Sequence, residues 1–484
     1  MNKQELIRQL QNMLPADAVL YEQEDLKPFE CDGLSAYREV PLAVVLPETE
    51  EQVRDILRLC LRENVPVVAR GAGTGLSGGA LPLRDGVLLS LSKFKRILSL
   101  DPLARIARVQ PGVRNLAISE AAAVHGLYYA PDPSSQIACS IGGNVAENAG
   151  GVHCLKYGLT VHNLHKVRAY TMEGELLEIG CEALDSAGYD LLALFTGSEG
   201  MLGVITEVTV KLLPKPELAQ VVMAAFATVA EAGSAVGEII AAGIIPAGLE
   251  MMDKLSIKAA EDFVHAGYPL DAEAILLCES DGTPEEVAEE IARMQAILSR
   301  CGATSLRTSA NETDRLRLWA GRKAAFPAVG RLSPDYYCMD GTIPRRELTH
   351  VLQRIAELSE EYGLRVANVF HAGDGNLHPL ILYDANQQGE FHRAEELGGK
   401  ILELCVEVGG TITGEHGVGI EKINQMCAQF KETELQRFRE VKLAFDPSGL
   451  LNPGKVIPSL HRCAEHGRMH VHHGQAAFPE IPRF

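Results

Sequence analysis

Residues 70–80 read Arg70-Gly71-Ala72-Gly73-Thr74-Gly75-Leu76-Ser77-Gly78-Gly79-Ala80. Five glycines in eleven residues leave backbone N–H groups unshielded and permit positive φ, as a loop that cradles phosphate requires. The apolar runs on either side, residues 65–69 and 87–91, predict strands. The NAD fingerprint places its glycine loop between a strand and a helix, so a loop between two strands argues against it. Taken alone, the stretch could also be a glycine-rich surface turn.

Length and charge exclude several classes of protein. A chain of 484 residues is long enough for two or more domains. The net charge of −19 repels nucleic acid and anionic lipid, so we expect neither as a partner. Eleven cysteines contain no Cys-x-x-Cys pair, which excludes the common ferredoxin-type clusters, and their odd number favours the reducing cytoplasm. No apolar run is long enough for a transmembrane segment.

The first half of the chain predicts strands, helices and two further glycine clusters. After a helical lead-in over residues 1–30, the capping box Thr49-Glu50-Glu51-Gln52 begins a helix. A second helix over residues 115–125 is stopped by Gly126. Residues 140–151 predict a short helix of small residues whose free N–H groups would receive a pyrophosphate, with close helix packing as the alternative. The third cluster, residues 196–203, precedes an alternating strand.

The second half alternates strand and helix after a boundary at Pro214 and Pro216. We expect residues 219–330 to form a sheet with helices on one face. Two more strands follow at 366–370 and 377–382, and residues 446–455 form a Pro/Gly-rich closing turn. The tail contains Cys463 and five histidines between His461 and His473, for which a flexible surface segment is favoured over a metal site.

Two turns carry the residues best suited to chemistry. A hairpin turn at Asp374-Gly375-Asn376 would bring His371 and His378 to one face, and Glu415 lies in a second glycine-flanked turn. Two histidines and one glutamate are the ligand set of an open catalytic Zn²⁺ or similar site. The neighbouring His416 is then free to act as a base. Satisfied structural histidines are the alternative.

Arg322 is the other candidate catalytic residue. Its guanidinium could hold a substrate carboxylate in a bidentate pair. The sequence alone is equally consistent with a solvated charge on a helix.

Together these motifs resemble a known family over almost the whole chain. The segments that carry the resemblance are residues 29–37, 70–82, 131–158, 196–203, 249–253, 333–345, 371–379, 414–417 and 460–473. They are similar to the flavin-binding D subunits of bacterial glycolate oxidases, which belong to the vanillyl-alcohol-oxidase/PCMH superfamily of FAD enzymes. The similarity of residues 460–473 separates the chain from general D-lactate dehydrogenases.

The resemblance implies an α+β fold with a PCMH-type two-subdomain FAD-binding domain and a cap domain built on an antiparallel sheet. The implied division is a lead-in over 1–37, the FAD domain over 38–216, the substrate or cap domain over 217–445, and a C-terminal return to the flavin with the His-rich tail over 446–484. The implied cofactor-binding residues are Arg70, Gly71, Ala72, Gly73, Thr74, Gly75, Ser77, Gly78, Pro131, Asp132, Ser134, Ser135, Ser140, Gly142, Gly143, Asn144, Asn148, Gly150, Gly151, Glu199, Gly203, Ile205 and Asn452. Thr74 stands where histidyl-linked relatives carry a histidine, so the implied FAD is non-covalent.

The resemblance also implies a mechanism. His371, His378 and Glu415 match the metal ligands of related D-2-hydroxyglutarate dehydrogenases, with Zn, Mn or Fe as the expected metal, while His416 matches the base and Arg322 the substrate-binding arginine. Cys338 replaces a lysine of those enzymes, which is compatible with a small substrate that lacks a second carboxylate.

The expected reaction is the oxidation of glycolate, and of D-lactate, by hydride transfer to flavin N5. The expected partners are a second flavin-domain subunit and an iron–sulfur subunit, with the chain in the cytoplasm and peripheral to the inner membrane. The alternatives are a cytochrome- or quinone-linked D-lactate dehydrogenase and a non-catalytic flavin scaffold.

Overall fold

The glycine loop at residues 71–79 leaves the edge of a small, mainly parallel sheet. The computed structural model describes residues 3–183 and 187–458. The first sheet has the order β1 (Val19–Leu20), β2 (Ala43–Val45), β4 (Val87–Ser90), β3 (Val67–Arg70). Strands β2, β4 and β3 run parallel, whereas β1 pairs antiparallel with β2. The N-terminal segment, predicted to be only helical, therefore also supplies a strand, because its Val19 and Leu20 complete the apolar side of this sheet.

The second sheet is antiparallel, and the other two glycine clusters lie next to it. The helix of the second cluster packs against the sheet, and the third cluster, residues 196–203, leads directly into one of its strands. Its order is β5 (Ile97–Asp101), β6 (Ile106–Val109), β10 (Val204–Lys211), β8 (Leu164–Tyr170), β9 (Leu176–Gly180). A two-stranded pair of β7 (Leu127–Tyr128) and β11 (Leu213–Pro214) lies beside it. The predicted stop at Gly126 is confirmed, since this residue takes the left-handed conformation (φ 68°) at the end of the helical segment.

The third sheet has seven strands and is wholly antiparallel. Its order is β15 (Ser305–Thr308), β12 (Leu218–Phe226), β14 (Ala274–Gly282), β13 (Gly248–Asp253), β17 (Val366–His371), β18 (Asn376–Tyr383), β16 (Asp335–Cys338). This sheet confirms the predicted antiparallel cap sheet and the α+β class.

Helices cover both faces of the third sheet, so the expectation of helices on one face was wrong. Apolar residues of α8 (Val229–Ala241), α10 (Pro284–Arg300), α13 (Leu348–Tyr362) and α14 (Glu390–Glu407) pack with Val222, Ala224 and Phe226. Those of α9 (Lys254–Val264), α11 (Glu312–Lys323) and α12 (Ala325–Val329) pack with the alternate residues Val221 and Met223. Successive side chains of a strand point to opposite faces, and here both sets are apolar, so both faces must be covered.

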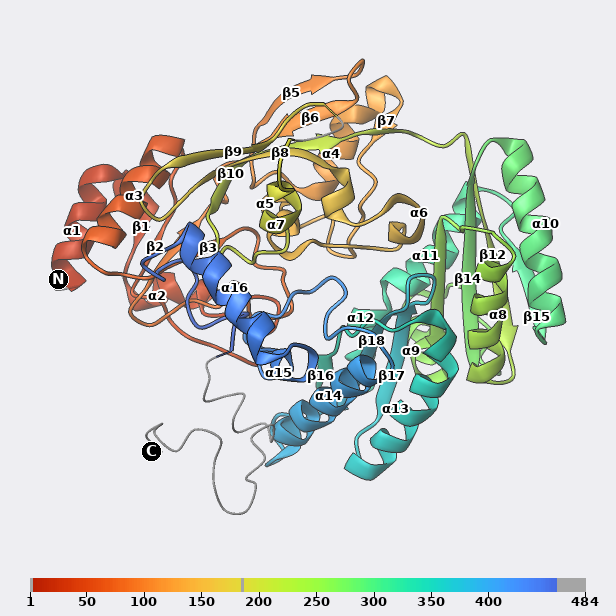
Figure 1. The fold of residues 1–484 in the computed structure, drawn as a ribbon. Helices are drawn as coiled ribbons and strands as arrows, with labels where there is room; N and C mark the ends of the chain where they lie inside the picture. Colours follow the sequence, from red (N-terminus) through yellow and green to blue (C-terminus); the bar gives the residue numbers. More distant parts are fainter. Residues whose placement is uncertain (1–2, 184–186, 459–484) are drawn as a thin grey trace.

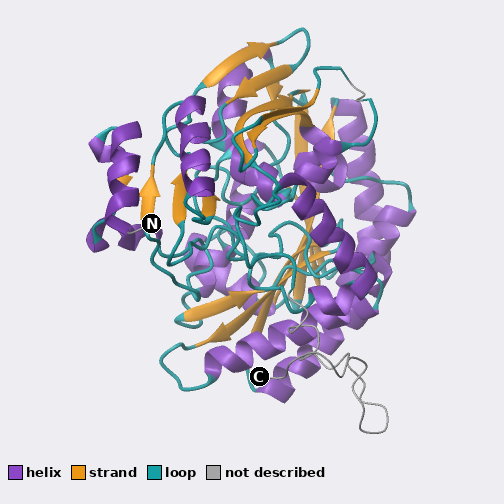
Figure 2. Ribbon diagram, turned by 60° about the vertical axis from the view of Figure 1, so that its left-hand side comes forward, coloured by secondary structure: helices purple, strands orange, loops and turns teal. Residues whose placement is uncertain are grey.

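The remaining helices lie in the N-terminal half or near the C-terminus of the described chain. They are α1 (Lys3–Met13), α2 (Gln23–Leu26), α3 (Glu50–Arg62), α4 (Asn115–Ala122), α5 (Ile141–Glu147), α6 (Cys154–Tyr157), α7 (Leu191–Phe195), α15 (Met426–Gln429) and α16 (Glu432–Phe445), with 3-10 helices Ala16–Ala18, Lys27–Phe29, Ala123–His125, Thr160–Asn163 and Arg345–Glu347. The capping box predicted for residues 49–52 is present at the start of α3. Figure 2 shows how helices surround the separate groups of strands.

The C-terminal segment returns to the first sheet. Val441 and Phe445 of α16, which is blue in Figure 1, pack against the apolar core of the second sheet. The closing turn extends the edge of β3, since Val67 N donates to Leu450 O at 2.9 Å and Asn452 N to Val67 O at 2.8 Å. The His-rich tail lies outside the described residues. No helix in residues 3–183 and 187–458 is long and apolar enough to cross a membrane.

Candidate active site

All three glycine clusters and the two histidine turns meet at one cavity. Most of the predicted cofactor residues line it: Arg70, Gly71, Ala72, Gly73, Thr74, Gly75, Ser134, Ser135, Ser140, Gly142, Gly143, Asn144, Glu199, Gly203 and Ile205. His378, Glu415 and His416 line the same cavity. The fold thus brings the predicted cofactor cradle and the predicted catalytic turns together.

The first glycine loop has the features of an anion cradle. Among the described residues, no backbone N–H of residues 72–76 donates a hydrogen bond. The loop also packs too closely for side chains, because a Cβ at Gly71 would lie 2.2 Å from Ser140 Oγ and one at Gly73 would lie 2.2 Å from Arg70 Nη2. The Arg70 guanidinium braces the loop and donates to Cys31 O at 2.7 Å. Unpaired N–H groups in a glycine loop fit the phosphates of a dinucleotide.

The short helix α5 contributes differently from what the sequence suggested. Its first N–H groups are used within the protein: Ile141 N donates to Val113 O, Gly142 N to Pro111 O and Gly143 N to Ser140 Oγ. The expectation that free N–H groups of this helix receive the pyrophosphate was therefore wrong. The small residues instead allow close packing, since a Cβ at Gly142 would lie 2.5 Å from that of Pro111.

The other predicted cofactor residues do not line the cavity. They are Ser77, Gly78, Pro131, Asp132, Asn148, Gly150, Gly151 and Asn452. Asn452 Nδ2 donates to Gly79 O and to Glu199 O, at 2.9 and 2.7 Å, and so ties the first cluster to the third. Gly151 (φ 149°) leaves no room for a Cβ beside the Asp132 backbone. These contacts position the lining loops.

The predicted hairpin places the two histidines side by side. Gly375 takes a positive φ of 82°, and β17 and β18 pair across the turn. The His371 and His378 rings lie 5.1 Å apart, and the Nε2 atoms of both approach Glu415 Oε1, at 3.2 and 3.3 Å. These three ligand atoms all lie within 4.8 Å of one another. Neither ring nitrogen of His378 has a hydrogen-bond partner of good geometry among the described residues. This donor set fits a divalent metal ion.

Glu250, on β13, orients this set and escaped the sequence prediction. Its Oε1 lies 2.7 Å from His371 Nδ1, and its Oε2 accepts from Arg322 Nε at 2.8 Å. A carboxylate on the distal ring nitrogen fixes the tautomer of a metal-binding histidine, leaving Nε2 toward the metal. Burial alone would raise the pKa of Glu250, but His371 and Arg322 outweigh it and lower that pKa.

Arg322 has a different immediate partner from the predicted substrate carboxylate. Its guanidinium is 1% exposed and pairs with Glu250, with Nη2 2.6 Å from Oε2. Arg322 is not among the residues that line the cavity. Nη2 nevertheless makes no hydrogen bond of good geometry within the described residues, so it retains donor capacity.

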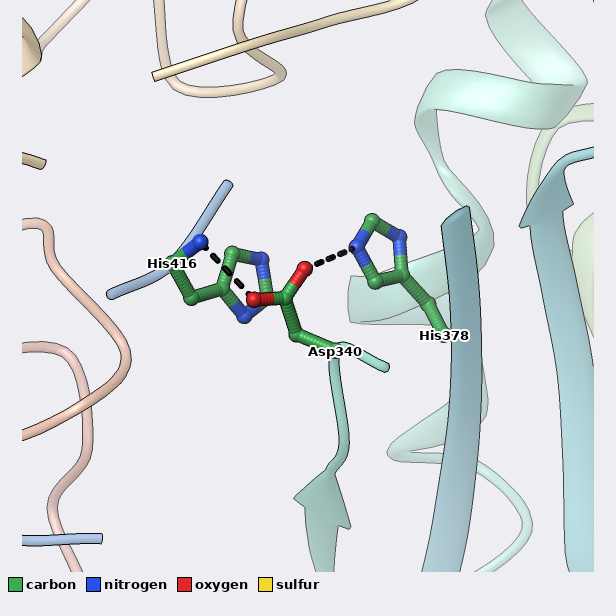
Figure 3. A group of neighbouring side chains, drawn as sticks. All are labelled: Asp340, His378 and His416. Atoms are coloured by element: carbon green, nitrogen blue, oxygen red, sulfur yellow. Dashed lines mark hydrogen bonds and ion pairs between the residues drawn. The ribbon is translucent and has the colours of Figure 1, made fainter. Parts of the chain in front are cut away.

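Asp340 organises the second histidine turn and was also missed. Its Oδ2 accepts from Thr413 Oγ1 at 2.6 Å, from His416 N at 2.9 Å and from Lys422 Nζ at 3.2 Å, and its Oδ1 lies 3.5 Å from His378 Nε2. Figure 3 shows Asp340 between His378 and the backbone of His416. Asp340 is fully buried, and its interactions with His416 and with the charged Lys422 outweigh that burial to hold the pKa of Asp340 well below its usual value.

His416 stands parallel to His378, with ring centroids 4.9 Å apart and an interplanar angle of 8°. Its Nδ1 is buried and has no hydrogen-bond partner among the described residues. Burial lowers the pKa of His416 to about 4, so the imidazole is neutral at pH 7. Glu415 is ionised instead. Burial alone would raise its pKa, but the nearby histidines outweigh burial and lower the pKa of Glu415 to about 2. The turn thus presents a neutral imidazole beside an ionised carboxylate.

Two buried carboxyl groups form a further part of the cavity wall. Glu147 and Glu199 both line it, and Glu199 accepts from the N–H groups of Val418 and Gly419 at 2.7 Å each. Burial, and then the Glu199 charge, raise the pKa of Glu147 well above its usual value. Only Glu199 was predicted here, because Glu147 sits among small helical residues with no motif of its own.

His153 joins the second glycine cluster to the third sheet. Its Nδ1 lies 2.9 Å from Asp132 Oδ2 and its Nε2 lies 3.2 Å from Glu279 Oε1 on β14. Burial would lower the pKa of His153, but Asp132 and Glu279 outweigh it and raise the pKa to about 10.

We expect this contact to give a pH-dependent stability. A raised histidine pKa contributes stability that is complete below about pH 6.5 and is lost as the pH rises toward 10. The free energy of unfolding, from urea titrations across this range, should fall by on the order of 2 kcal/mol more in the native chain than in H153Q. The exposed His125 supplies the control H125Q, which should follow the native chain. Equal pH slopes for the native chain and H153Q would contradict the prediction.

Sequence comparison identifies the class of protein. Residues 41–180 match the family described as "FAD binding domain", and residues 215–456 match "FAD linked oxidases, C-terminal domain". The chain therefore belongs to the FAD-linked oxidases and is an FAD-dependent oxidoreductase.

Individual relatives agree with this assignment. The chain is 70% identical to the glycolate oxidase subunit GlcD of Escherichia coli K12, over 98% of this chain and 95% of the relative. It is 35% identical to a D-lactate dehydrogenase of Archaeoglobus fulgidus, over 86% and 91% of the two chains. The solved structure of p-cresol methylhydroxylase superposes with a TM-score of 0.81 at 17% identity, over 95% of this chain and 97% of the other. The predicted family and the PCMH-type fold are thereby confirmed.

Proposed function

We propose that this chain oxidises glycolate, and D-lactate more slowly, to the corresponding 2-oxo acid. The observation that carries the proposal is the meeting of His378, Glu415 and His416 with the glycine loops at one cavity. The 70% identity to a glycolate oxidase subunit supports glycolate as the substrate. When bound, FAD supplies the acceptor for the two electrons removed from the substrate carbon.

The chain's own residues bind the substrate and remove its hydroxyl proton. His416 is the base: its unpartnered Nδ1 makes it available, and Asp340 holds its backbone in place. We assign the substrate carboxylate to Arg322, whose Nη2 makes no hydrogen bond of good geometry among the described residues. Because Arg322 pairs with Glu250 and does not line the cavity, this assignment requires its guanidinium to turn toward the cavity when the substrate binds. Phe326 lies edge-on to His378, at 5.9 Å between centroids, and narrows the cavity toward a small substrate. Cys338, at the position where the D-2-hydroxyglutarate dehydrogenases carry a lysine, is buried in the core and brings no charge to the site.

His371, His378 and Glu415 would hold the proposed divalent metal ion. It would polarise the substrate hydroxyl and lower its pKa. We expect dialysis against EDTA to reduce substrate-dependent flavin bleaching at least about tenfold, with recovery on adding Zn²⁺ or Mn²⁺. H371Q should bind less metal by elemental analysis, whereas H350Q, at an exposed histidine of α13, should bind the native amount. Full activity in metal-free protein would refute this role.

The proposal extends to partners and location. Since the sequence lacks ferredoxin-type cysteine motifs, electrons leave through other subunits, for which a second flavin-domain subunit and an iron–sulfur subunit are proposed. The name of the relative, a glycolate oxidase subunit, supports assembly into a complex. We propose a cytoplasmic position, peripheral to the inner membrane through that complex, and the domain division at residues 37, 216 and 445.

The test is an anaerobic visible spectrum of the purified, flavin-loaded chain before and after substrate. Bleaching by glycolate that is faster than bleaching by D-lactate supports the proposal. The reverse order would favour the D-lactate dehydrogenase, which the 35% identical relative makes the second candidate. A flavin spectrum that neither acid changes would favour a non-catalytic scaffold.

A further inference from the structure

A second groove lies near the buried Asp340–Lys422 pair, since Glu421 in its lining lies 3.4 Å from Lys422 Nζ. Its lining comes from α14, from Tyr337 on β16, from Tyr37 near the N-terminus and from residues 420–425. None of these residues lines the flavin cavity. The groove is therefore separate from the candidate active site.

Glu421 lines this groove. Its side chain is 1% exposed, and neither carboxylate oxygen makes a hydrogen bond of good geometry among the described residues. Lys422 Nζ lies 3.4 Å from Oε2, but the same ammonium also lies 3.2 Å from Asp340 and donates to Gly417 O at 2.8 Å. A buried carboxylate that shares its one cation in this way retains unused acceptor capacity.

The groove wall carries more negative than positive charge. Glu395, Glu396 and Glu403 of α14 join Glu421, and the one lysine or arginine among the described lining residues is Lys400, whose Nζ donates to Glu403 at 2.8 Å. His392 Nε2 lies 3.3 Å from Glu396 Oε1. Glu396 and Glu403 are two turns apart on one helix, which separates their Cα atoms by about 10 Å along its axis. The negative charge is thus spread along the groove.

Aromatic rings complete the wall. Tyr37, Tyr337 and Tyr362 all line the groove, and the Tyr37 hydroxyl donates to Glu395. The faces of tyrosine rings attract ammonium groups by cation–π interaction, and this attraction adds to that of the neighbouring carboxylates. Tyrosines beside carboxylates are a common way to bind organic cations.

The spacing argues against a single metal ion as the occupant. In the part of the chain that the structure describes, the groups of three or more ligating side chains with converging atoms lie at the candidate active site, and none lies at this groove. A ligand with several positive charges along a flexible chain matches the distributed carboxylates better.

We infer that this groove is a binding site for a linear polyamine, with one ammonium group held by Glu421 and another by the carboxylates of α14. The methylene linkers of such a ligand lie against the tyrosine rings and Met339. Lys422 contacts both Glu421 in this groove and Asp340 at the candidate active site. The groove nevertheless takes a different class of ligand from the flavin cavity.

Binding should depend on pH through Glu421. Burial is the main reason that the pKa of Glu421 is raised to about 7. Since the cation binds the ionised carboxylate, affinity should increase by up to about tenfold between pH 6 and pH 8. The other titratable or charged groups around Glu421 are Lys422, Asp340 and Tyr337 behind it, and Tyr37, Tyr362, His392, Glu395, Glu396, Lys400 and Glu403 along the groove.

The test is calorimetric titration of the FAD-loaded full-length chain with spermidine in 150 mM NaCl, which screens diffuse surface attraction. We expect one binding site, weakened at least about tenfold by E421Q and less by E396Q on the exposed rim. Glu217, an exposed carboxylate outside the groove, provides the control E217Q, which should bind as the native chain does. Circular dichroism and flavin content verify that each variant is folded.

Several outcomes would overturn the inference. If E421Q and E396Q bind spermidine as tightly as the native chain, spermidine binds elsewhere. If E217Q weakens binding as much as E421Q does, the weakening comes from the change in net charge and not from the groove. Displacement of spermidine by an equal concentration of Mg²⁺ would assign the groove to an inorganic cation. The absence of measurable binding at pH 8 would also reject it.

Discussion

H416Q is expected to slow the reduction of the bound flavin by glycolate by a factor of about 10³, within the range typical for loss of a general base. His416 lines the cavity, its Nδ1 has no partner among the described residues, and its ring stacks on His378. Glutamine keeps the polarity and approximate size of the side chain but cannot take up the substrate proton. Anaerobic stopped-flow spectroscopy at 450 nm, about the usual flavin absorption band, would measure the rate.

The controls for this experiment separate chemistry from binding. Flavin content and the free energy of unfolding should change little in H416Q, because the Asp340 contact is made by the backbone N–H of residue 416 and not by its side chain. The exposed histidine variant H350Q should reduce its flavin at the native rate. A rate for H416Q within threefold of native would show that another group takes the proton.

D340N is expected to destabilise the chain by about 3–5 kcal/mol, the cost of removing one partner from a buried charge pair. Asp340 and Lys422 are both fully buried and lie 3.2 Å apart. An asparagine would remove the negative charge and one acceptor atom from the turn that carries Glu415 and His416. Urea unfolding followed by circular dichroism would measure the loss, and substrate-dependent bleaching should fall with it.

A double-mutant cycle tests the cause of this destabilisation. If the main cost is the buried Lys422 charge that has lost Asp340 and keeps only Glu421, D340N/K422M should be more stable than D340N alone. D335N, at the half-exposed start of the same strand β16, should cost less than about 1 kcal/mol. An equal loss in D335N and D340N would show that β16 tolerates no amide and that the buried pair has no special role.

Local chemistry made much of the fold predictable. The capping box at residues 49–52, the helix stop at Gly126 and the turn at 374–376 all occur as predicted, because caps and turn glycines act over a few residues. The covering of both faces of the third sheet was missed. The run at residues 221–226 is apolar throughout, and such a run does not tell how many layers will cover it.

The candidate site divides in the same way. The sequence identified the glycine loop, the two histidine turns and the Glu415–His416 pair, since each is a short motif. It missed Glu250, Asp340 and Lys422, although a charged residue within an apolar strand such as β13 signals a buried partner.

The sequence by itself determined which short segments could bind phosphate, ligate a metal ion or accept a proton. Only the tertiary structure decided how these groups are oriented and charged. Glu250 and His371 are 121 residues apart and Asp340 and His416 are 76 apart, yet each pair meets in the interior. Burial removes water from such groups, so each must find a partner of opposite charge or a hydrogen-bond donor wherever the fold places one. The same packing used the N–H groups of α5 and left those of residues 72–76 without a hydrogen-bond partner among the described residues.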